Sequence, residues 1–142
     1  MTLQLIEGPA GGGKSGVAAL LLAAGEIEVL ADVTALWAAL GGAQRGPDGR
    51  YPVRFDDDPA LAIARYVQAA VVRQALEDGY DVGVTTSQRN RVEHWRRFAD
   101  DAGTAFLVRT VDPGRDVVRE RLSEPDGSLS DACARAIRRW YG

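Results

Sequence analysis

Residues 8–15 have the sequence GPAGGGKS, which follows a short apolar run at residues 3–6 and precedes an apolar segment at residues 14–24. The run predicts a buried strand, and the segment predicts a helix that is apolar almost all round and so buried against a sheet. A glycine-rich turn lets several backbone N–H groups converge on one phosphate, and the helix that follows adds the positive end of its dipole. The pattern therefore predicts a phosphate-binding loop between a strand and a helix.

The residue types in this loop suit a nucleoside triphosphate that is bound with Mg²⁺. Lys14 would reach the β- and γ-phosphates, and the hydroxyl of Ser15 would bind the metal. We expect the nucleotide to contact Gly8, Gly11, Gly12, Gly13, Lys14, Ser15 and Gly16. The chain has no Asn-Lys-x-Asp guanine signature, which favours ATP. Because ATPases, GTPases and kinases share this loop, the motif leaves the reaction open.

Apolar runs separated by turn residues predict alternating strands and helices along the rest of the chain. We expect strands at 28–31, 81–86 and 105–111, and helices at 33–40, 59–78, 88–102, 116–122 and 131–140. This alternation predicts an α/β fold, a three-layer sandwich of the P-loop type with four or five mainly parallel strands. The nucleotide should lie at the carboxyl ends of those strands.

The length of 142 residues and a hydrophobic fraction of 46% suit a single nucleotide-binding domain over residues 1–142. Residues 41–58 are rich in turn formers and are expected to form a loop insertion that contacts the substrate or a partner. Residues 112–142 are expected to form a lid-like helix and a C-terminal helix. The net charge of −3 disfavours nucleic acid as the main partner, although the arginines and aromatics of the 41–58 loop are where it would bind.

Composition also bounds the location of the protein. No apolar run of ~18 residues is present, so no membrane contact is expected. The chain starts without a basic leader and has a single cysteine, Cys133, which excludes a disulfide within the chain. We therefore expect a cytoplasmic protein with access to ATP and magnesium.

Four stretches together resemble the small P-loop kinases of the polynucleotide-kinase and zeta-toxin type, a group also described as AAA-like ATPases. They are the phosphate loop, residues 29–32 with an acidic residue at the end of the second strand, residues 75–88, and residues 108–112 with the arginines that follow. Only the phosphate loop is specific. The resemblance implies a central first strand flanked by the third and fourth, with the second strand at the edge.

The resemblance also implies roles for three residues beyond the loop. Asp32 would act as general base on an acceptor hydroxyl or assist the metal, while Arg115 and Arg119 would join Lys14 in stabilising the transferred phosphoryl group. The residues alone allow other interpretations. Asp32 suits a helix cap, and the arginines suit a solvated helix face.

The end of the third strand departs from the family, which has an acidic residue where this chain has Thr85. Asp112, after the fourth strand, is a candidate to replace it. Two functions therefore stay open. One is a magnesium-dependent ATPase or small kinase-like phosphotransferase that acts on a hydroxyl acceptor. The other is a nucleotide-dependent assembly or binding factor, of phage origin, which binds a protein partner with little turnover.

Overall fold

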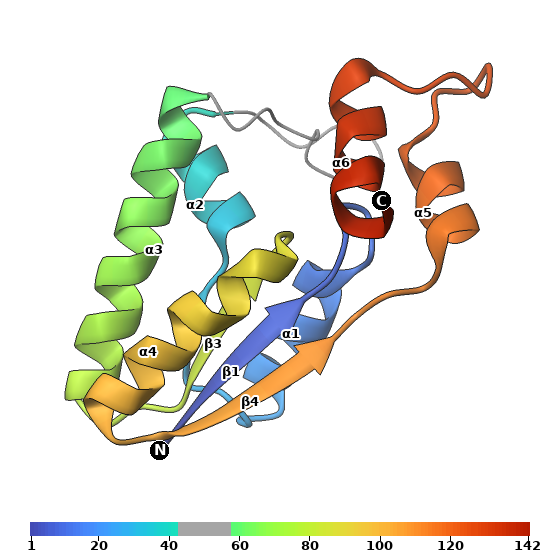
Figure 1. The fold of residues 1–142 in the computed structure, drawn as a ribbon. Helices are drawn as coiled ribbons and strands as arrows, with labels where there is room; N and C mark the ends of the chain where they lie inside the picture. The colour runs from blue at the N-terminus through green and yellow to red at the C-terminus, as the bar shows by residue number, and fades with distance from the viewer. Residues whose placement is uncertain (43–57) are drawn as a thin grey trace.

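The computed structural model describes residues 1–42 and 58–142 and has one parallel sheet, with the strand order β2-β3-β1-β4. The strands are β1 (Thr2–Glu7), β2 (Val29–Ala31), β3 (Val82–Thr86) and β4 (Ala105–Thr110). The central strand β1 pairs with β3 and β4, and β2 pairs with β3 at the edge (Figure 1). The predicted α/β fold and strand order are therefore confirmed. Most of the predicted 41–58 loop lies outside the described residues.

Helices connect the strands, and their bounds lie within two residues of the predicted ones, except that the helix predicted to begin at residue 88 begins at Val92, after a 3₁₀ turn. They are α1 (Lys14–Ala23), α2 (Val33–Ala39), α3 (Pro59–Glu77), α4 (Val92–Ala102) after the 3₁₀ turn η1 (Arg89–Arg91), α5 (Arg115–Leu122) and α6 (Asp131–Tyr141). Capping side chains fix where several of these helices begin. The side chains of Asp58 and Ser130, for example, accept backbone N–H groups in the first turns of α3 and α6. Among the described helices, none combines the length and apolar character needed to cross a membrane.

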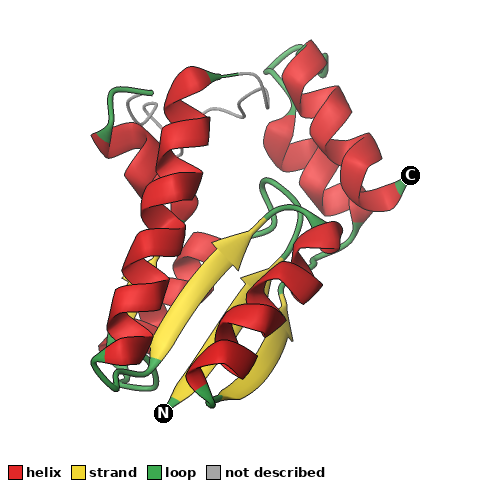
Figure 2. Cartoon of the chain, turned by 60° about the vertical axis from the view of Figure 1, so that its left-hand side comes forward, coloured by secondary structure: helices red, strands yellow, loops and turns green. Residues whose placement is uncertain are grey.

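The two faces of the sheet carry different helices, which gives three layers (Figure 2). On one face α3 and α4 pack against β1 and β3 through Leu3, Leu5, Val72, Leu76, Val82, Val84, Trp95 and Ala99. On the other face α1 packs with Ala18 and Leu21 against Ile6 and Ile27. The predicted burial of α1 against the sheet is therefore confirmed. Its Leu20 is 71% exposed, because only the side of the helix that faces the sheet is covered.

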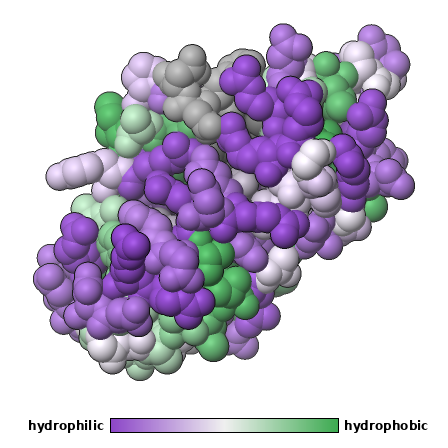
Figure 3. All heavy atoms as spheres, viewed as in Figure 1, coloured by the Kyte–Doolittle hydropathy of each residue, from purple (hydrophilic) through white to green (hydrophobic). Residues whose placement is uncertain are grey.

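Strand β4 forms the second edge of the sheet and is largely exposed. Leu107 and Val108 leave 53% and 42% of their surface exposed. Figure 3 shows hydrophobic surface in the region of β4, beside the mostly hydrophilic surface of α4. The tightly buried strands are thus β1 and β3, whose carboxyl ends lead into the predicted phosphate loop and into η1.

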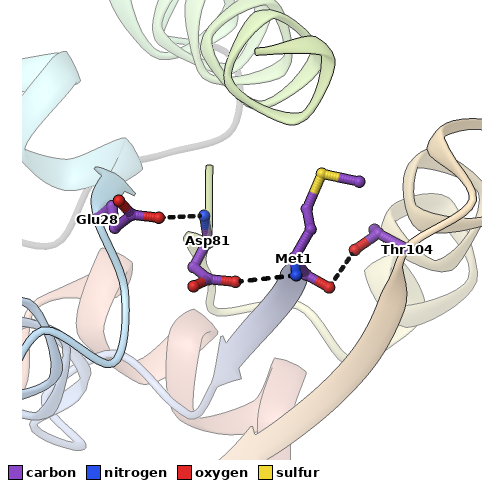
Figure 4. Close-up of polar contacts among 4 residues, drawn as sticks. All are labelled: Met1, Glu28, Asp81 and Thr104. Atoms are coloured by element: carbon purple, nitrogen blue, oxygen red, sulfur yellow. Dashed lines mark hydrogen bonds and ion pairs between the residues drawn. The ribbon is translucent and has the colours of Figure 1, made fainter. Parts of the chain in front are cut away.

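Contacts at the amino end of the sheet hold the starts of the strands together (Figure 4). The backbone nitrogen of Met1 lies 3.7 Å from Oδ1 of Asp81, and the Thr104 hydroxyl donates to the carbonyl of Met1 at 2.6 Å. The N–H of Asp81 donates to Oε1 of Glu28 at 3.0 Å. These contacts fix the end of the sheet that lies opposite the phosphate loop.

Helices α5 and α6 pack on each other at the carboxyl end of the sheet (Figures 1 and 2). Asp112, just after β4, accepts hydrogen bonds from the ring nitrogen of Trp140 at 3.2 Å and from the hydroxyl of Tyr141. Arg89 of η1 donates to the carbonyl of Trp140 at 3.1 Å and lies over its ring at 4.3 Å. The end of α6 is thereby tied to β4 and η1, on the side where the phosphate loop lies.

Candidate active site

The glycine-rich loop joins the end of β1 to the start of α1. Gly13 precedes the helix with a φ of +96°, and α1 begins at Lys14. Ser15 and Gly16 stand in the first turn, where N–H groups have no partner within the helix. The ammonium of Lys14 donates to the carbonyl of Pro9 at 2.9 Å, so it lies across the loop. The loop therefore brings backbone donors and one cation to the positive end of a helix dipole.

Two glycines of this loop leave no room for a side chain. A Cβ at Gly8 would overlap the carbonyl oxygen of Val111, which follows β4. A Cβ at Gly11 would lie 2.9 Å from Leu122, and Gly11 has a φ of +76°, which favours glycine. The loop backbone is thus packed between the segment after β4 and the end of α5, which explains why glycine is needed at these two positions.

Asp32 connects the end of β2 to the loop. Its Oδ2 accepts a hydrogen bond from the Ser15 hydroxyl at 2.9 Å. Its Oδ1 accepts the N–H of Thr34 at 3.0 Å, which caps α2, and the Thr85 hydroxyl at 3.3 Å. The two interpretations of Asp32 are therefore compatible, because the same carboxylate caps a helix and contacts the predicted metal ligand.

Thr85 stands near the end of β3, where the resemblance implies an acidic residue. Thr85 is 2% exposed. Its hydroxyl accepts the N–H of Val33 at 3.3 Å and donates to Asp32. This hydroxyl therefore links β3 to the end of β2. The carboxylate that the described residues bring to Ser15 comes from the neighbouring strand β2.

The donor set around Ser15 fits Mg²⁺ bound together with a nucleotide. Magnesium in phosphate sites usually has one or two protein ligands, with phosphate oxygens and water in its other positions. Ser15 and Asp32 supply a hydroxyl and a carboxylate of that kind. Residues 1–42 and 58–142 contain no cluster of three or more His, Cys, Asp or Glu that would hold a metal by itself.

The arginines of α5 differ in their distance from the loop. Nη1 of Arg121 donates to the carbonyl of Gly11 at 3.1 Å. Arg115 instead donates to the carbonyl of Gly142 at 3.4 Å and lies over the ring of Tyr141. The guanidinium of Arg119 makes no polar contact with the described part of the chain. Arg119 is two residues from Arg121, so the two side chains leave the helix on nearly opposite sides.

Asp112, the other acidic candidate, belongs to the anchor of α6. The hydrogen bond from Tyr141, followed by those from the N–H of Gly114 and the ring of Trp140, lowers the pKa of this carboxyl. Burial and the hydrogen bond to Asp112 raise the pKa of Tyr141 to about 12. Both shifts stabilise the charged aspartate against a neutral tyrosine. The contacts of Asp112 in the structure are thus structural ones.

A pocket opens beside the loop, between α3, the end of β3, η1 and α6. Its wall includes Ala10 of the phosphate loop and Val33 and Thr85, the two residues linked to Asp32. The rest of the wall is mostly polar and contains Arg65, Gln68, Thr86, Ser87, Gln88, Arg91 and Arg139. The pocket therefore adjoins both the glycine-rich loop and the residues linked to Asp32.

Sequence reasoning missed two of these pocket residues, Arg65 and Gln68. Gln68 lies on the buried face of α3 in the series Leu61, Ala64, Gln68 and Val72, with 4% of its surface exposed. Its Nε2 donates to the carbonyls of Ala31 at 2.8 Å and Thr85 at 3.0 Å. The sequence does contain a signal for Gln68, because a glutamine stands at a position where the helical repeat of α3 predicts an apolar core residue.

Comparison with known proteins supports the fold. No protein-family model matches the chain, and a search of curated proteins finds no match. Among solved structures, the chain is similar to one described as "a putative kinase" from Chloroflexus aurantiacus J-10-fl, with a TM-score of 0.71 and 15% sequence identity. The alignment covers 99% of this chain and 79% of that one. The chain therefore shares the α/β fold of that protein.

Proposed function

We propose that this chain is a magnesium-dependent phosphotransferase that moves the γ-phosphoryl group of ATP to a hydroxyl acceptor. The observation that carries the proposal is the 2.9 Å contact between Ser15 and Asp32, directly beside a glycine-rich loop with Lys14 at the start of α1. The kinase-like fold and the pocket next to Ala10 support it. The structural neighbour is itself described as "a putative kinase", which agrees with this reaction class.

In this proposal the loop holds the nucleotide. The backbone donors of the loop and the Lys14 ammonium bind the β- and γ-phosphates. The acceptor oxygen forms a bond to the γ-phosphorus while the bond from that phosphorus to the ADP oxygen breaks, and the proton of the acceptor hydroxyl passes to solvent, or to Asp32 in its alternative role as general base. Arg121 takes the charge-stabilising position expected for Arg115 and Arg119, because it already contacts the loop through Gly11. Roles for Arg115 and Arg119 stay predictions.

Asp32 has two candidate roles, as metal-site carboxylate and as general base. Its Oδ1 already accepts from Thr34 and Thr85, so Oδ2 is the oxygen with capacity left, and Oδ2 faces Ser15. We therefore assign Ser15 and Asp32 to Mg²⁺, which when bound would neutralise charge on the phosphates. The general-base role stays the alternative for the same residue.

The test begins with calorimetric titration of Mg-ATP into the wild-type protein and the Lys14→Ala variant, followed by phosphate-release measurements on the same samples. Loss of one charge-assisted contact of about 1.5–3 kcal/mol predicts binding about 10- to 100-fold weaker in the variant. Arg97→Ala, which removes an exposed cation from α4, is the charge-matched control. Equal binding by wild type and Lys14→Ala would contradict the proposal.

Lys14 is the only lysine of the chain, which allows a second and independent test. Amine acylation followed by mass spectrometry can label only Lys14 and the terminal amine. Mg-ATP should protect Lys14 and leave the terminal amine reactive, so each sample contains its own control.

Binding without turnover, over a broad set of hydroxyl acceptors, would instead favour the nucleotide-dependent binding or assembly factor. The use of the Thr85 hydroxyl at the end of β3, in place of an acidic residue, is the observation that favours that second candidate.

A further inference from the structure

The pocket beside the phosphate loop has an unusual charge composition. Three arginines contribute to its wall, Arg65 from α3, Arg91 from η1 and Arg139 from α6, and none of the described residues that line it is acidic. They reach the pocket from three separate elements. A wall with three guanidinium groups attracts an anionic ligand more strongly than a neutral or cationic one.

Arg91 carries the argument furthest. It is half-buried, and its guanidinium makes no hydrogen bond or ion pair with residues 1–42 or 58–142. Burial, and then the neighbouring charge of Arg65, lower the pKa of Arg91. Trp95, four residues further along the chain, is 2% exposed and lines the same pocket. A partly desolvated guanidinium in a pocket wall suits bidentate binding of a phosphate or carboxylate.

Gln68 adds a second polar group of a different kind. Both donors of its amide bind main-chain carbonyls, which fixes the orientation of the amide. Its Oε1 is therefore the remaining polar atom of a side chain that is only 4% exposed and lines the pocket. Within the described residues no donor pairs with this oxygen. A buried acceptor of this kind needs a donor such as a ligand hydroxyl.

The size of the pocket limits what enters it. The volume that water can occupy is about 50 Å³. One water needs about 10–15 Å³ on this measure, so the space suits a few waters or a single small group such as phosphate or carboxylate. The remainder of a larger ligand would extend through the open side of the pocket.

We propose that the acceptor of this phosphotransferase is an anionic compound, which places a phosphate or carboxylate against Arg91 and Arg65 and donates a hydroxyl hydrogen bond to Gln68. The reaction in this inference rests on the proposed function, whereas the anionic class of the ligand is inferred from the pocket residues alone. Binding and transfer are therefore measured separately.

Binding is measured by calorimetry on the full chain with its phosphate loop filled by a non-hydrolysable ATP analogue and Mg²⁺, so that added anions cannot enter the loop. The probes are inorganic phosphate and a matched set on one carbon skeleton: glycerol, glycerate and glycerol 3-phosphate. We expect saturable binding of the anions, at least tenfold tighter than that of glycerol. Comparison of glycerate with glycerol 3-phosphate tells which oxyanion is preferred.

Arg91→Ala should weaken anion binding at least tenfold, Arg91→Lys should weaken it less, and Arg97→Ala should leave it unchanged. Circular dichroism checks that each variant is folded. Failure of all anions to saturate the wild type, or equal loss in Arg91→Ala and Arg97→Ala, would overturn the anion site. Transfer that is as fast to neutral as to anionic acceptors would also overturn it, yet would leave the phosphotransferase intact. Anion binding without any transfer would support the site and contradict the reaction.

Discussion

Substitution of Asp32 by asparagine and by alanine separates its structural contacts from its charge. The alanine variant loses the helix cap on Thr34, which costs about 1 kcal/mol. It also loses the hydrogen bonds from Ser15 and Thr85, each of which contributes about 0.5–1.5 kcal/mol. If these contributions add, the Asp32→Ala protein should be less stable than the wild type by about 2–4 kcal/mol.

The asparagine variant should behave differently. Asparagine is as good an N-cap as aspartate, and its amide can keep contacts with Ser15 and Thr85, so we expect a loss of less than about 1 kcal/mol. Its missing charge should nevertheless weaken Mg-ATP binding and remove most of the turnover, because a neutral amide is a poor magnesium ligand. Asp32→Asn should thus be stable and inactive, whereas Asp32→Ala should be both unstable and inactive.

Urea unfolding followed by tryptophan fluorescence measures the stability, and calorimetry with and without Mg²⁺ measures the binding. Asp100→Asn, which changes an exposed carboxylate on α4, is the matched control. If Asp32→Asn binds Mg-ATP and turns over like the wild type, Asp32 is a helix cap only. If Asp32→Ala unfolds at the same urea concentration as the wild type, the three hydrogen bonds described above do not stabilise the protein.

Three further perturbations address the loop and the anchor of α6. Gly8→Ala places a methyl group where a backbone carbonyl lies, so it should cost about 1–3 kcal/mol and abolish Mg-ATP binding; unchanged thermal stability and affinity would contradict the tight packing of the loop. Arg121→Ala should lower turnover at least tenfold, while Arg119→Ala should have little effect. If steady-state kinetics instead show the larger loss of turnover in Arg119→Ala, the charge-stabilising role belongs to Arg119, as the family resemblance implies. The pKa of Tyr141 is raised to about 12, so its share of stability is present below pH ~10 and is lost as the pH rises towards 12. Tyr141→Phe should remove that part of the alkaline stability loss while it also weakens the hold of Asp112 on α6, and an unchanged alkaline unfolding curve would show that this hydrogen bond does not matter.

The fold could be predicted because local signals agree along the chain. Glycine, proline and cap residues mark the ends of the helices, and apolar runs of strand length lie between them. The apolar sequence of α1 correctly predicted burial against the sheet, but such a sequence does not tell how many helices lie on that face of the sheet. Leu20 of the same helix is exposed.

The site was predictable where one short motif holds all its parts, and much less so where separate elements meet. Arg115 and Arg119 share a helix face, and the resemblance favoured them. The structure shows that the apolar residues Val118 and Leu122 set which side of α5 faces the molecule, and Arg121 lies near that side. The pocket wall joins Arg65 and Arg91, which are far apart in α3 and η1, and no local pattern indicates that they meet.

The contacts at the amino end of the sheet make the two ends of each strand unequal. Met1, Asp81 and Thr104 hold that end together, while the opposite end carries the phosphate loop and the anchored helices. Amide hydrogen exchange should therefore be slowest near the amino ends of β1 and β3 and should change little there when a ligand binds. Exchange at that end then serves as a built-in reference, against which protection gained at the carboxyl end locates any bound nucleotide or anion residue by residue.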